Sequence, residues 1–532
     1  MLRRPRAATV TDTATAAAPA RHDAGAKRRG TAWTMLLATL AGALSLFTFA
    51  PFGAWPLQFF LLAFLFYQVG MDTSVQRASL IGWAFGLGWS VAGMHWLYIA
   101  MHRFGGLAAP LAALAILLLG AYMGLFAAFA MGVAAWLRRR WSLPVAAFLM
   151  LALPVLWGLS EWMRGWVFTG FPWAASGYAH HASPLAGFAP LVGVYGIGML
   201  VALGASCLAM LTQRARWPAI GLLCALLAAG YGLRAIDWTR PHGAPISVRL
   251  LQGNVAQGEK FETEHINGAL TLYRDLITAA PADLIATPET AIVLFPQQLP
   301  PDYLPGLARF ARDTGSSLLY GIPLADSPTR ITNSVAGLGP SGQAYRFDKQ
   351  HLVPFGEFVP RGFRWFVDMM QIPLGDFHRG ASIQPPFAVK DQLVLPNVCY
   401  EDAFGEEIAA QLRGAPRPAT ILFNASNLAW YGESVAIPQH LQISRMRALE
   451  TGRPMLRATN SGATAVIDAR GNVIASLPFY GRGALAARVQ GMEGMTPYIR
   501  LGNMLFLAMG ALALAAAWVF GRKYRTSTAS LA

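Results

Sequence analysis

The stretch Leu393-Val-Leu-Pro-Asn-Val-Cys399-Tyr-Glu-Asp402 decides how the second half of the chain is interpreted. An apolar, β-branched run ends in a cysteine, and an acidic pair and a helical pattern over residues 403–412 follow directly. A strand that turns tightly into a helix presents a nucleophile at the edge of a sheet, where the helix N-terminus favours a thiolate. A single cysteine is more often a buried, inert thiol, so a reactive role for Cys399 depends on the residues around it.

Hydrophobic residues dominate the composition. They make up 55% of the 532 residues, and 13% are charged, whereas a soluble protein carries about 25% charge. We therefore expect a membrane protein with one soluble domain. The expected parts are a disordered basic tail (1–30), a bundle of about seven spans (31–236), an α/β domain (240–498), a final span (501–520) and a basic tail (521–532).

Eight segments are apolar enough to be membrane spans, with seven as the main alternative count. They are residues 33–50, 55–70, 79–100, 107–136, 143–160, 185–212, 217–234 and 501–520. Basic residues cluster in both tails, at Arg138–Arg140 and at Arg214 and Arg216. With eight spans these clusters share one side, which predicts cytoplasmic termini and a domain outside the cytoplasm. Topology and anionic lipid then account for much of the formal charge of +15 without a nucleic-acid partner.

An aromatic loop, Glu161–Trp173, joins the fifth and sixth expected spans. Its aromatic side chains suit the headgroup level of a membrane, either as a belt or as a lipid contact, and the two roles are compatible. Glu161 and Arg164 are at helical spacing, so the two side chains are able to pair.

The hydrophobic period changes at Pro245. Strands are expected at 246–251, 282–286, 317–322, 333–337, 344–347, 393–398, 420–423, 455–458, 463–467 and 473–475, and helices at 261–279, 302–313, 403–412 and 438–450. This alternation, with added antiparallel pairs, predicts a layered α/β sandwich. The domain has no glycine-rich phosphate loop, so nucleotide binding is disfavoured. The three cysteines and the scattered histidines have no metal-site spacing, and we expect neither a metal nor a cofactor.

Glu289, Lys349 and Cys399 follow the apolar runs of different expected strands. A carboxylate can accept the thiol proton, and an ammonium group can lower the thiol pKa and stabilise an oxyanion. Glutamate and lysine are usually surface residues, but the apolar runs before these two argue for a buried site.

Three motifs carry a family resemblance: Pro288-Glu289, Asp348-Lys349-Gln-His-Leu-Val-Pro-Phe-Gly-Glu357 and Asn397-Val-Cys399-Tyr-Glu401. They resemble the Glu–Lys–Cys signature of the nitrilase superfamily, and most closely its apolipoprotein N-acyltransferases. Further matching stretches are Gly170–Trp173, Gln439–Gln442, Arg445–Pro454 and Thr459–Gly462. The resemblance implies a multispan bundle in the bacterial inner membrane with an inserted periplasmic αββα domain.

The resemblance implies Glu289 as general base, Lys349 as oxyanion stabiliser and Cys399 as nucleophile. It places supporting residues at Glu357, Tyr400, Glu401 and Asn333, and lid or lipid contacts at Phe261, Trp365, Phe366 and Trp430. Many members of the family have aspartate where this chain has Leu428, so no role of that aspartate is transferred.

The implied reaction moves a fatty acyl group from a phospholipid, typically phosphatidylethanolamine, through a thioester on Cys399. The acceptor is the free α-amino group of the N-terminal S-diacylglyceryl-cysteine of an apolipoprotein, and the enzyme is expected to be a monomer. Two alternatives remain: a membrane-anchored amidase or nitrilase, and a non-catalytic lipid-binding or transport protein. One span would suffice to anchor a hydrolase, and the spans hold few of the ionisable residues that transport uses.

Overall fold

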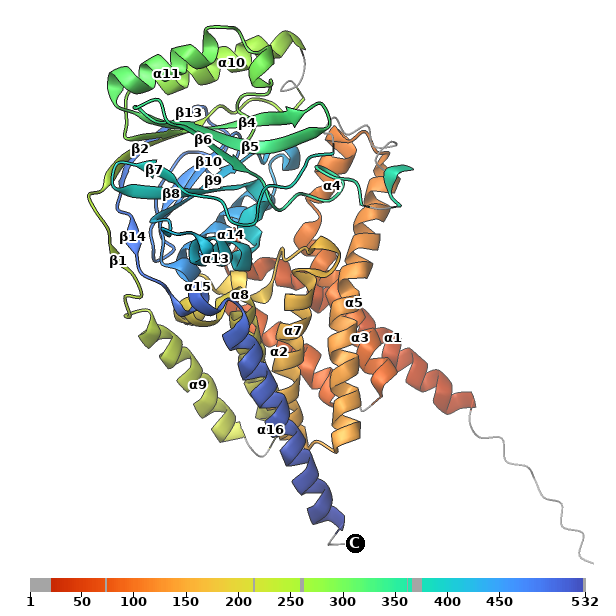
Figure 1. The fold of residues 1–532 in the computed structure, drawn as a ribbon. Helices are drawn as coiled ribbons and strands as arrows, with labels where there is room; N and C mark the ends of the chain where they lie inside the picture. The colour runs from red at the N-terminus through yellow and green to blue at the C-terminus, as the bar shows by residue number, and fades with distance from the viewer. Residues whose placement is uncertain are drawn as a thin grey trace, which may run out of the picture.

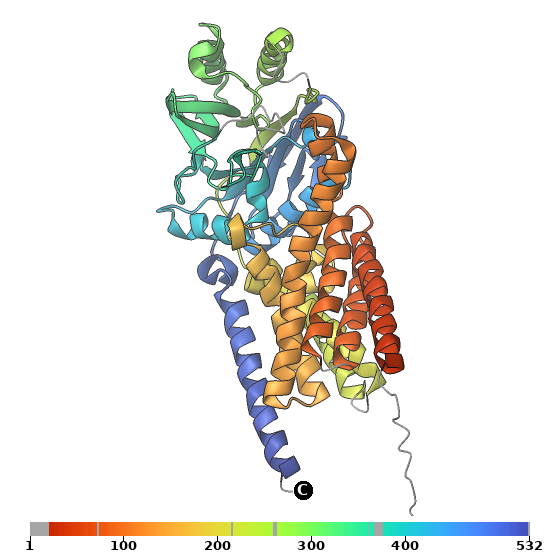
Figure 2. The same ribbon diagram turned by 90° about the vertical axis from the view of Figure 1, so that its right-hand side faces the viewer.

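A bundle of long helices forms one end of the molecule and an α/β domain forms the other (Figures 1 and 2). The computed structural model describes residues 21–71, 74–213, 216–258, 263–360, 362–365 and 376–529. The long helices of the bundle are α1 (Arg21–Leu44), α2 (Trp55–Met71), α3 (Val75–Met94), α5 (Ala109–Trp141), α7 (Leu153–Arg164), α8 (Ala189–Ala209), α9 (Arg216–Leu233) and α16 (Met504–Ala529).

A helix lies at each of the eight expected spans. Six helical stretches in the described residues are long and apolar enough to cross a membrane: Gly30–Thr48, Ala109–Trp141, Val145–Arg164, Pro184–Thr212, Arg216–Leu233 and Met504–Thr526. Helix α2 is apolar but shorter, and α3 is not among the six. The chain is thus a multispan helical protein, and the count of eight spans stays a prediction.

Two boundaries differ from the sequence analysis. Helix α1 begins at Arg21, inside the segment expected to be a disordered tail, because alanine, lysine and arginine favour helix. Residues Arg138–Arg140 form the last turn of α5 rather than a loop, where their positive charges interact favourably with the negative end of the helix dipole. Arg214 and residues 1–20 lie outside the described residues.

The α/β domain has four layers, as predicted. One six-stranded sheet has the order β13-β2-β3-β4-β5-β6 and the other β12-β11-β10-β9-β8-β7. Helices α10 (Thr263–Thr278) and α11 (Tyr303–Thr314) lie outside the first sheet, and α13 (Gly405–Gly414) and α14 (Ala436–Thr451) outside the second (Figure 1).

The strands of the first sheet are β2 (Ile246–Gln252), β3 (Leu284–Ala286), β4 (Ser317–Ser327), β5 (Arg330–Leu338), β6 (Ala344–Asp348) and β13 (Gly483–Val489). Those of the second are β7 (Phe387–Val389), β8 (Gln392–Val398), β9 (Ile421–Ser426), β10 (Met455–Thr459), β11 (Ala465–Ile467) and β12 (Val473–Ser476). Strand β13 was not expected from the sequence, because it is alanine-rich and has weak β propensity. It pairs antiparallel with β2 along its whole length.

Two apolar cores hold the layers together. Side chains from both sheets, among them Leu250, Leu284 and Phe423, are fully buried between them. A second core, which includes Leu307 and Leu318, fills the space between the first sheet and its two helices. Burial of apolar surface on both faces fixes the register of each strand, because a slip by one residue would turn every side chain to the other face.

The helices of the second layer pack directly on the membrane bundle. One apolar core contains bundle residues together with Phe404, Ile443 and Met446 of the α/β domain. Buried hydrogen bonds also cross the same boundary. The Tyr178 hydroxyl donates to the Ala403 carbonyl at 2.9 Å, and the Val194 N–H donates to Glu450 Oε1 at 2.8 Å. The domain is therefore seated on the bundle rather than tethered to it.

The aromatic loop after α7 divides into an exposed and a buried part. Trp166 and Phe168 are exposed, whereas Trp173 is buried and donates through Nε1 to Gln439 Oε1 at 2.7 Å. The expected pair of Glu161 and Arg164 is present at 4.0 Å, with both side chains buried. The exposed part suits a membrane interface, and the buried part supports the α/β domain.

Helices α1 and α3 cross through a close glycine contact, which yields a stability prediction. A Cβ at Gly88 would collide with the carbonyl oxygen of Thr39, whereas nothing lies within 4 Å of one at Gly221 in α9. We expect Gly88→Leu to force the helices apart and to lower the unfolding free energy by about 1–3 kcal/mol. Thermal unfolding of the purified protein in detergent would measure it, and an equal loss in the matched variant Gly221→Leu would contradict the explanation.

Candidate active site

The three residues singled out from the sequence come from two different sheets. Glu289 follows β3, and Lys349 follows β6 directly, in the first sheet. Cys399 follows β8 directly, in the second sheet. The side chains of the three interact electrostatically, since both Glu289 and Lys349 act on the Cys399 thiol. Folding therefore brings together residues that are 50 or more positions apart in the chain.

A buried lysine is the centre of this cluster. The side chain of Lys349 is 1% exposed. Its Nζ atom lies 2.8 Å from Glu357 Oε1 and 3.4 Å from Glu289 Oε1. Burial by itself would lower the pKa of Lys349, but the two carboxylates outweigh burial and raise it. The group therefore carries a permanent positive charge.

Asn333 ties the two carboxylates together. Its Nδ2 atom donates to Glu289 Oε1 and to Glu357 Oε1, both at 2.8 Å. Glu289 Oε2 accepts the backbone N–H of Asn427 at 3.1 Å. Glu357 Oε2 accepts the backbone N–H of Val353 at 2.8 Å. Glu289 is thus oriented by an amide and an ammonium group before any substrate is present, which is how preorganised catalytic groups are held.

The backbone of Cys399 is in the left-handed region, with φ of 54°. Non-glycine residues in this region carry strain of about 1–3 kcal/mol and cluster at functional sites. A 3₁₀ turn, Cys399–Ala403, follows, and α13 begins only at Gly405. The expectation that a helix N-terminus stabilises a Cys399 thiolate is therefore wrong, because the turn separates the thiol from the helix.

The electrostatic surroundings of Cys399 favour the thiol. Burial and the neighbouring Glu289 carboxylate raise the pKa of Cys399, and the opposing effects of Lys349 and the Asn427 N–H are weaker. Lys349 does lower this pKa, as expected from the sequence, but burial and the Glu289 carboxylate together outweigh its effect. A resting thiol needs a base before it can attack, and Glu289 is the adjacent carboxylate.

Glu401 lies within the 3₁₀ turn Cys399–Ala403, here called the cysteine turn, and its side chain is buried. Its carboxylate accepts the N–H groups of Gln350, His351 and Val398, at 2.7, 3.0 and 2.6 Å. It thereby connects the segment after Lys349 with the last residue before Cys399. Burial raises the pKa of Glu401 to about 7, although these N–H groups oppose the rise.

A second buried cluster, which the sequence analysis missed, supports the cysteine turn from behind. His440 Nε2 lies 2.7 Å from Asp402 Oδ1 and 3.2 Å from the Cys399 carbonyl oxygen. Arg457 Nη1 lies 2.9 Å from Asp402 Oδ2, and Ser444 contacts both. All four side chains are buried. A signal was present in the sequence, since polar and charged residues occur on both faces of the predicted helix 438–450.

The cysteine turn also contacts the bundle. The Tyr400 hydroxyl donates to the Gly170 carbonyl at 3.1 Å, and its ring stacks with Phe171 at 5.9 Å between centroids. Beyond the site, Trp430 meets Phe104 at 5.9 Å. The residue next to the thiol is therefore held by the aromatic loop of the membrane part.

The remaining residues expected from the sequence to act at the site either line its edge or lie outside the described residues. Leu428 is buried and packs against Cys399 and Ile437, so it contributes an apolar wall. Trp365 is 65% exposed and Phe363 is 46% exposed, as a lipid contact requires. Phe261 and Phe366 lie outside the described residues. Within the described part of the chain, no group of three acidic, cysteine or histidine side chains is placed to hold a metal ion.

The fold and the Glu–Lys–Cys cluster define a nitrilase-type α/β domain seated on a membrane bundle. Residues 245–498 match the carbon-nitrogen hydrolase family, and residues 41–207 match the apolipoprotein N-acyltransferase N-terminal domain. A solved amidase from Nesterenkonia is similar to 49% of this chain and 95% of its own at 18% identity, with a TM-score of 0.37.

Proteins similar to nearly the whole chain identify the family within this class. Apolipoprotein N-acyltransferase of Ralstonia nicotianae is 51% identical over 90% of this chain and 92% of its own. The enzymes of the same name from Bordetella bronchiseptica and Nitrosomonas europaea are each 43% identical, over 93% and 91% of this chain and 99% and 96% of their own. The chain belongs to the apolipoprotein N-acyltransferase family.

The buried lysine yields a prediction about stability. Lys349→Met leaves Glu289 and Glu357 without their shared cation, and we expect it to lower the unfolding free energy by about 3–5 kcal/mol. Adding Glu357→Gln removes one stranded charge, so the double variant should lose less than the sum of the two single variants. Unfolding in detergent would measure all three. The exposed Lys390→Met, which loses only a surface pair with Asp283, is the control, and strict additivity would disprove the coupling.

The pKa of Glu401 yields a prediction about pH. Its folded value of about 7 lies above the ordinary 4.5, so between these values the folded state binds more protons than the unfolded state. The contribution of Glu401 to the free energy of unfolding is therefore largest at low pH and is lost as pH rises through about 7. Glu401→Gln cannot ionise, so the wild-type minus variant difference in melting temperature should fall between pH 5 and 8. A constant difference would refute the prediction.

Proposed function

We propose that this protein transfers a fatty acyl group from a phospholipid to the α-amino group of a lipoprotein's N-terminal S-diacylglyceryl-cysteine. Membership of the apolipoprotein N-acyltransferase family supports this reaction. The main structural support for this reaction is that the cysteine turn packs on the membrane bundle, where Tyr400 is hydrogen-bonded to Gly170. A thiol held at the junction of membrane and α/β domain suits two substrates that both reside in a lipid bilayer.

In the first half-reaction Glu289 takes the thiol proton of Cys399 as the sulfur attacks the carbonyl carbon of a phospholipid ester. The ammonium group of Lys349 and the N–H of Tyr400 stabilise the oxyanion that develops. The C–O bond to the glycerol breaks, and the proton held by Glu289 passes to the departing lysophospholipid hydroxyl. An acyl thioester on Cys399 remains.

In the second half-reaction the neutral α-amino group attacks the thioester. Glu289 accepts the amine proton and returns it to the departing thiolate, so the product is an amide and the enzyme regains its resting thiol. Burial and Glu289 raise the pKa of Cys399, which makes return of the proton favourable at the end of the cycle. A thioester is activated toward amines, so ester-to-amide transfer needs no cofactor.

The other members of the cluster have positioning roles in this proposal. Glu357 positions the Lys349 ammonium group, and Asn333 positions the Glu289 carboxylate. Glu401 binds the backbone after Lys349 and the backbone before Cys399. The apolar wall formed by Leu428 keeps water from the thioester. Trp365 and Trp430, with Phe261 and Phe366, are the proposed lid or lipid contacts.

We further propose that the active-site end faces the periplasm of a bacterial inner membrane and that both termini are cytoplasmic. Arg138–Arg140 lie in the last turn of α5, and α16 carries Arg522, Lys523 and Arg525 toward its C-terminus. Both helices end at the side of the bundle away from the α/β domain (Figure 1). Basic residues favour the cytoplasmic side. Phosphatidylethanolamine is the proposed donor and a monomer the proposed state.

The intact mass of the purified protein after incubation with phosphatidylethanolamine tests the mechanism. We expect one added fatty-acyl mass on the wild type, removal of that mass by hydroxylamine, and no adduct on Cys399→Ala. Glu289→Gln should form the adduct about 10²–10⁴-fold more slowly, because it lacks the base. Cys224→Ala, which removes an exposed cysteine in α9, is the matched control and should acylate normally.

The fate of the acyl group separates the alternatives. Discharge by a diacylglyceryl-cysteinyl peptide, with an amide as product, would support acyl transfer. Discharge to free fatty acid with the peptide present would favour a membrane-anchored hydrolase. Failure of the wild type to form any adduct would favour a lipid-binding or transport protein.

A further inference from the structure

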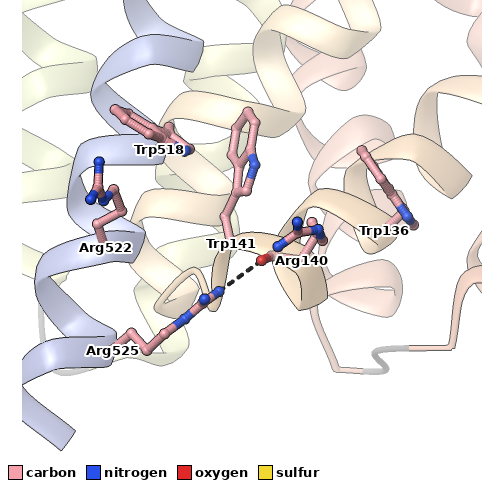
Figure 3. A pocket seen from close by; sticks show the side chains of 6 residues that line it. All are labelled: Trp136, Arg140, Trp141, Trp518, Arg522 and Arg525. Atoms are coloured by element: carbon pink, nitrogen blue, oxygen red, sulfur yellow. Dashed lines mark hydrogen bonds between the residues drawn. The ribbon is translucent and has the colours of Figure 1, made fainter. Parts of the chain in front are cut away.

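A hollow lined by arginine and tryptophan lies between the C-terminal ends of α5 and α16. Its volume is about 370 Å³, and six side chains line it: Trp136, Arg140, Trp141, Trp518, Arg522 and Arg525 (Figure 3). The two helix ends are at the far end of the bundle from the α/β domain (Figures 1 and 2). The hollow is therefore separate from the active site, and the proposed reaction does not use it.

Contacts between the two helices build the hollow. Arg525 Nη2 donates to the Arg140 carbonyl oxygen at 2.8 Å, which attaches α16 to the end of α5. Gly521 allows the close approach, because a Cβ there would collide with the Trp141 carbonyl oxygen. The Arg522 guanidinium lies 4.8 Å from the centre of the Trp518 ring. These contacts fix the walls, while Arg140 and Arg522 as residues remain exposed.

The charge of the hollow is one-sided. Three of the six lining residues are arginines and none is acidic. In the described part of the chain, neither Arg140 nor Arg522 has an ion-pair partner. Guanidinium groups bind phosphate through paired N–H donors. The lining thus suits an anion the size of a lipid headgroup.

The tryptophans identify the source of that anion. Trp136 is 52% exposed and Trp518 is 42% exposed, and half-exposed tryptophan at the end of an apolar helix sits at the headgroup level of a bilayer. A soluble phosphate would gain nothing from apolar rings, whereas the glycerol and upper acyl chains of a lipid would pack on them. Basic pockets between spanning helices are known to take anionic headgroups.

We propose that this hollow binds the headgroup of an anionic phospholipid from the leaflet that covers this end of the bundle. Arg140 and Arg522 line the hollow from the two helices and attract the anionic headgroup, the tryptophans pack on the glycerol and upper acyl chains, and the lipid fastens α16 to α5. The site differs from the proposed acyl-donor site in position and in its requirement for net negative charge.

Native mass spectrometry of the full-length protein, released from nanodiscs of equal phosphatidylglycerol and phosphatidylethanolamine, tests the proposal. The test variant is Arg140→Gln with Arg522→Gln, and the matched control is Arg139→Gln with Lys523→Gln, which removes the same charge from the same helix ends, outside the lining. Both variants lose the same diffuse attraction to the anionic leaflet. Only the test variant also loses the guanidinium groups of the hollow, so its retained ratio of the two lipids should fall about tenfold below that of the control.

Equal loss in both double variants would overturn the site in favour of diffuse charge. Protection of the melting temperature by inorganic phosphate alone, at the concentration that works for phosphatidylglycerol, would overturn the lipid as ligand. Acyl transfer from phosphatidylethanolamine should continue in both double variants, because their substitutions lie far from Cys399. The proposed lipid site and the proposed reaction can therefore fail independently.

Discussion

The ammonium group of Lys349 is the interaction on which the site depends. It is buried between two carboxylates, and Asn333 bonds to both. An isolated buried charge would be strongly unfavourable, so each member of the group requires the others. In the proposed reaction, the same arrangement orients Glu289 as the base and provides a cation for the oxyanion. Stability of the cluster and readiness for catalysis thus have one electrostatic origin.

The second determinant is the surface on which the cysteine turn rests. Tyr400 is bonded to Gly170 and stacked on Phe171, while His440 contacts the Cys399 carbonyl from the opposite direction and stacks with Trp173 at 5.7 Å. The strained backbone of Cys399 is therefore held by residues of the α/β domain and of the membrane part together. This shared support couples the position of the thiol to the packing of the α/β domain on the bundle.

The sequence predicted the outline well because its signals are local. Apolar runs of spanning length predicted the helices, and alternating strands and helices predicted the four-layer domain. Motifs predicted Glu289, Lys349 and Cys399, which the fold brings together although no local pattern relates them. The β13 strand and the cluster of Asp402, His440 and Arg457 were missed. Their identity depends on partners distant in the chain, β2 for the strand and Cys399 for the cluster.

The sequence by itself determined which chemical groups are present, because residue identity sets nucleophile, base and cation. It determined where helices and strands form, because hydrophobic period and length are properties of short segments. Only the tertiary structure decided the protonation of the thiol. The pKa of Cys399 depends on burial and on the charges of Glu289, Lys349 and Glu357, which are distant in the chain, so the sequence-based expectation of a favoured thiolate was wrong. Electrostatic effects act through space, and the chain order does not contain those distances.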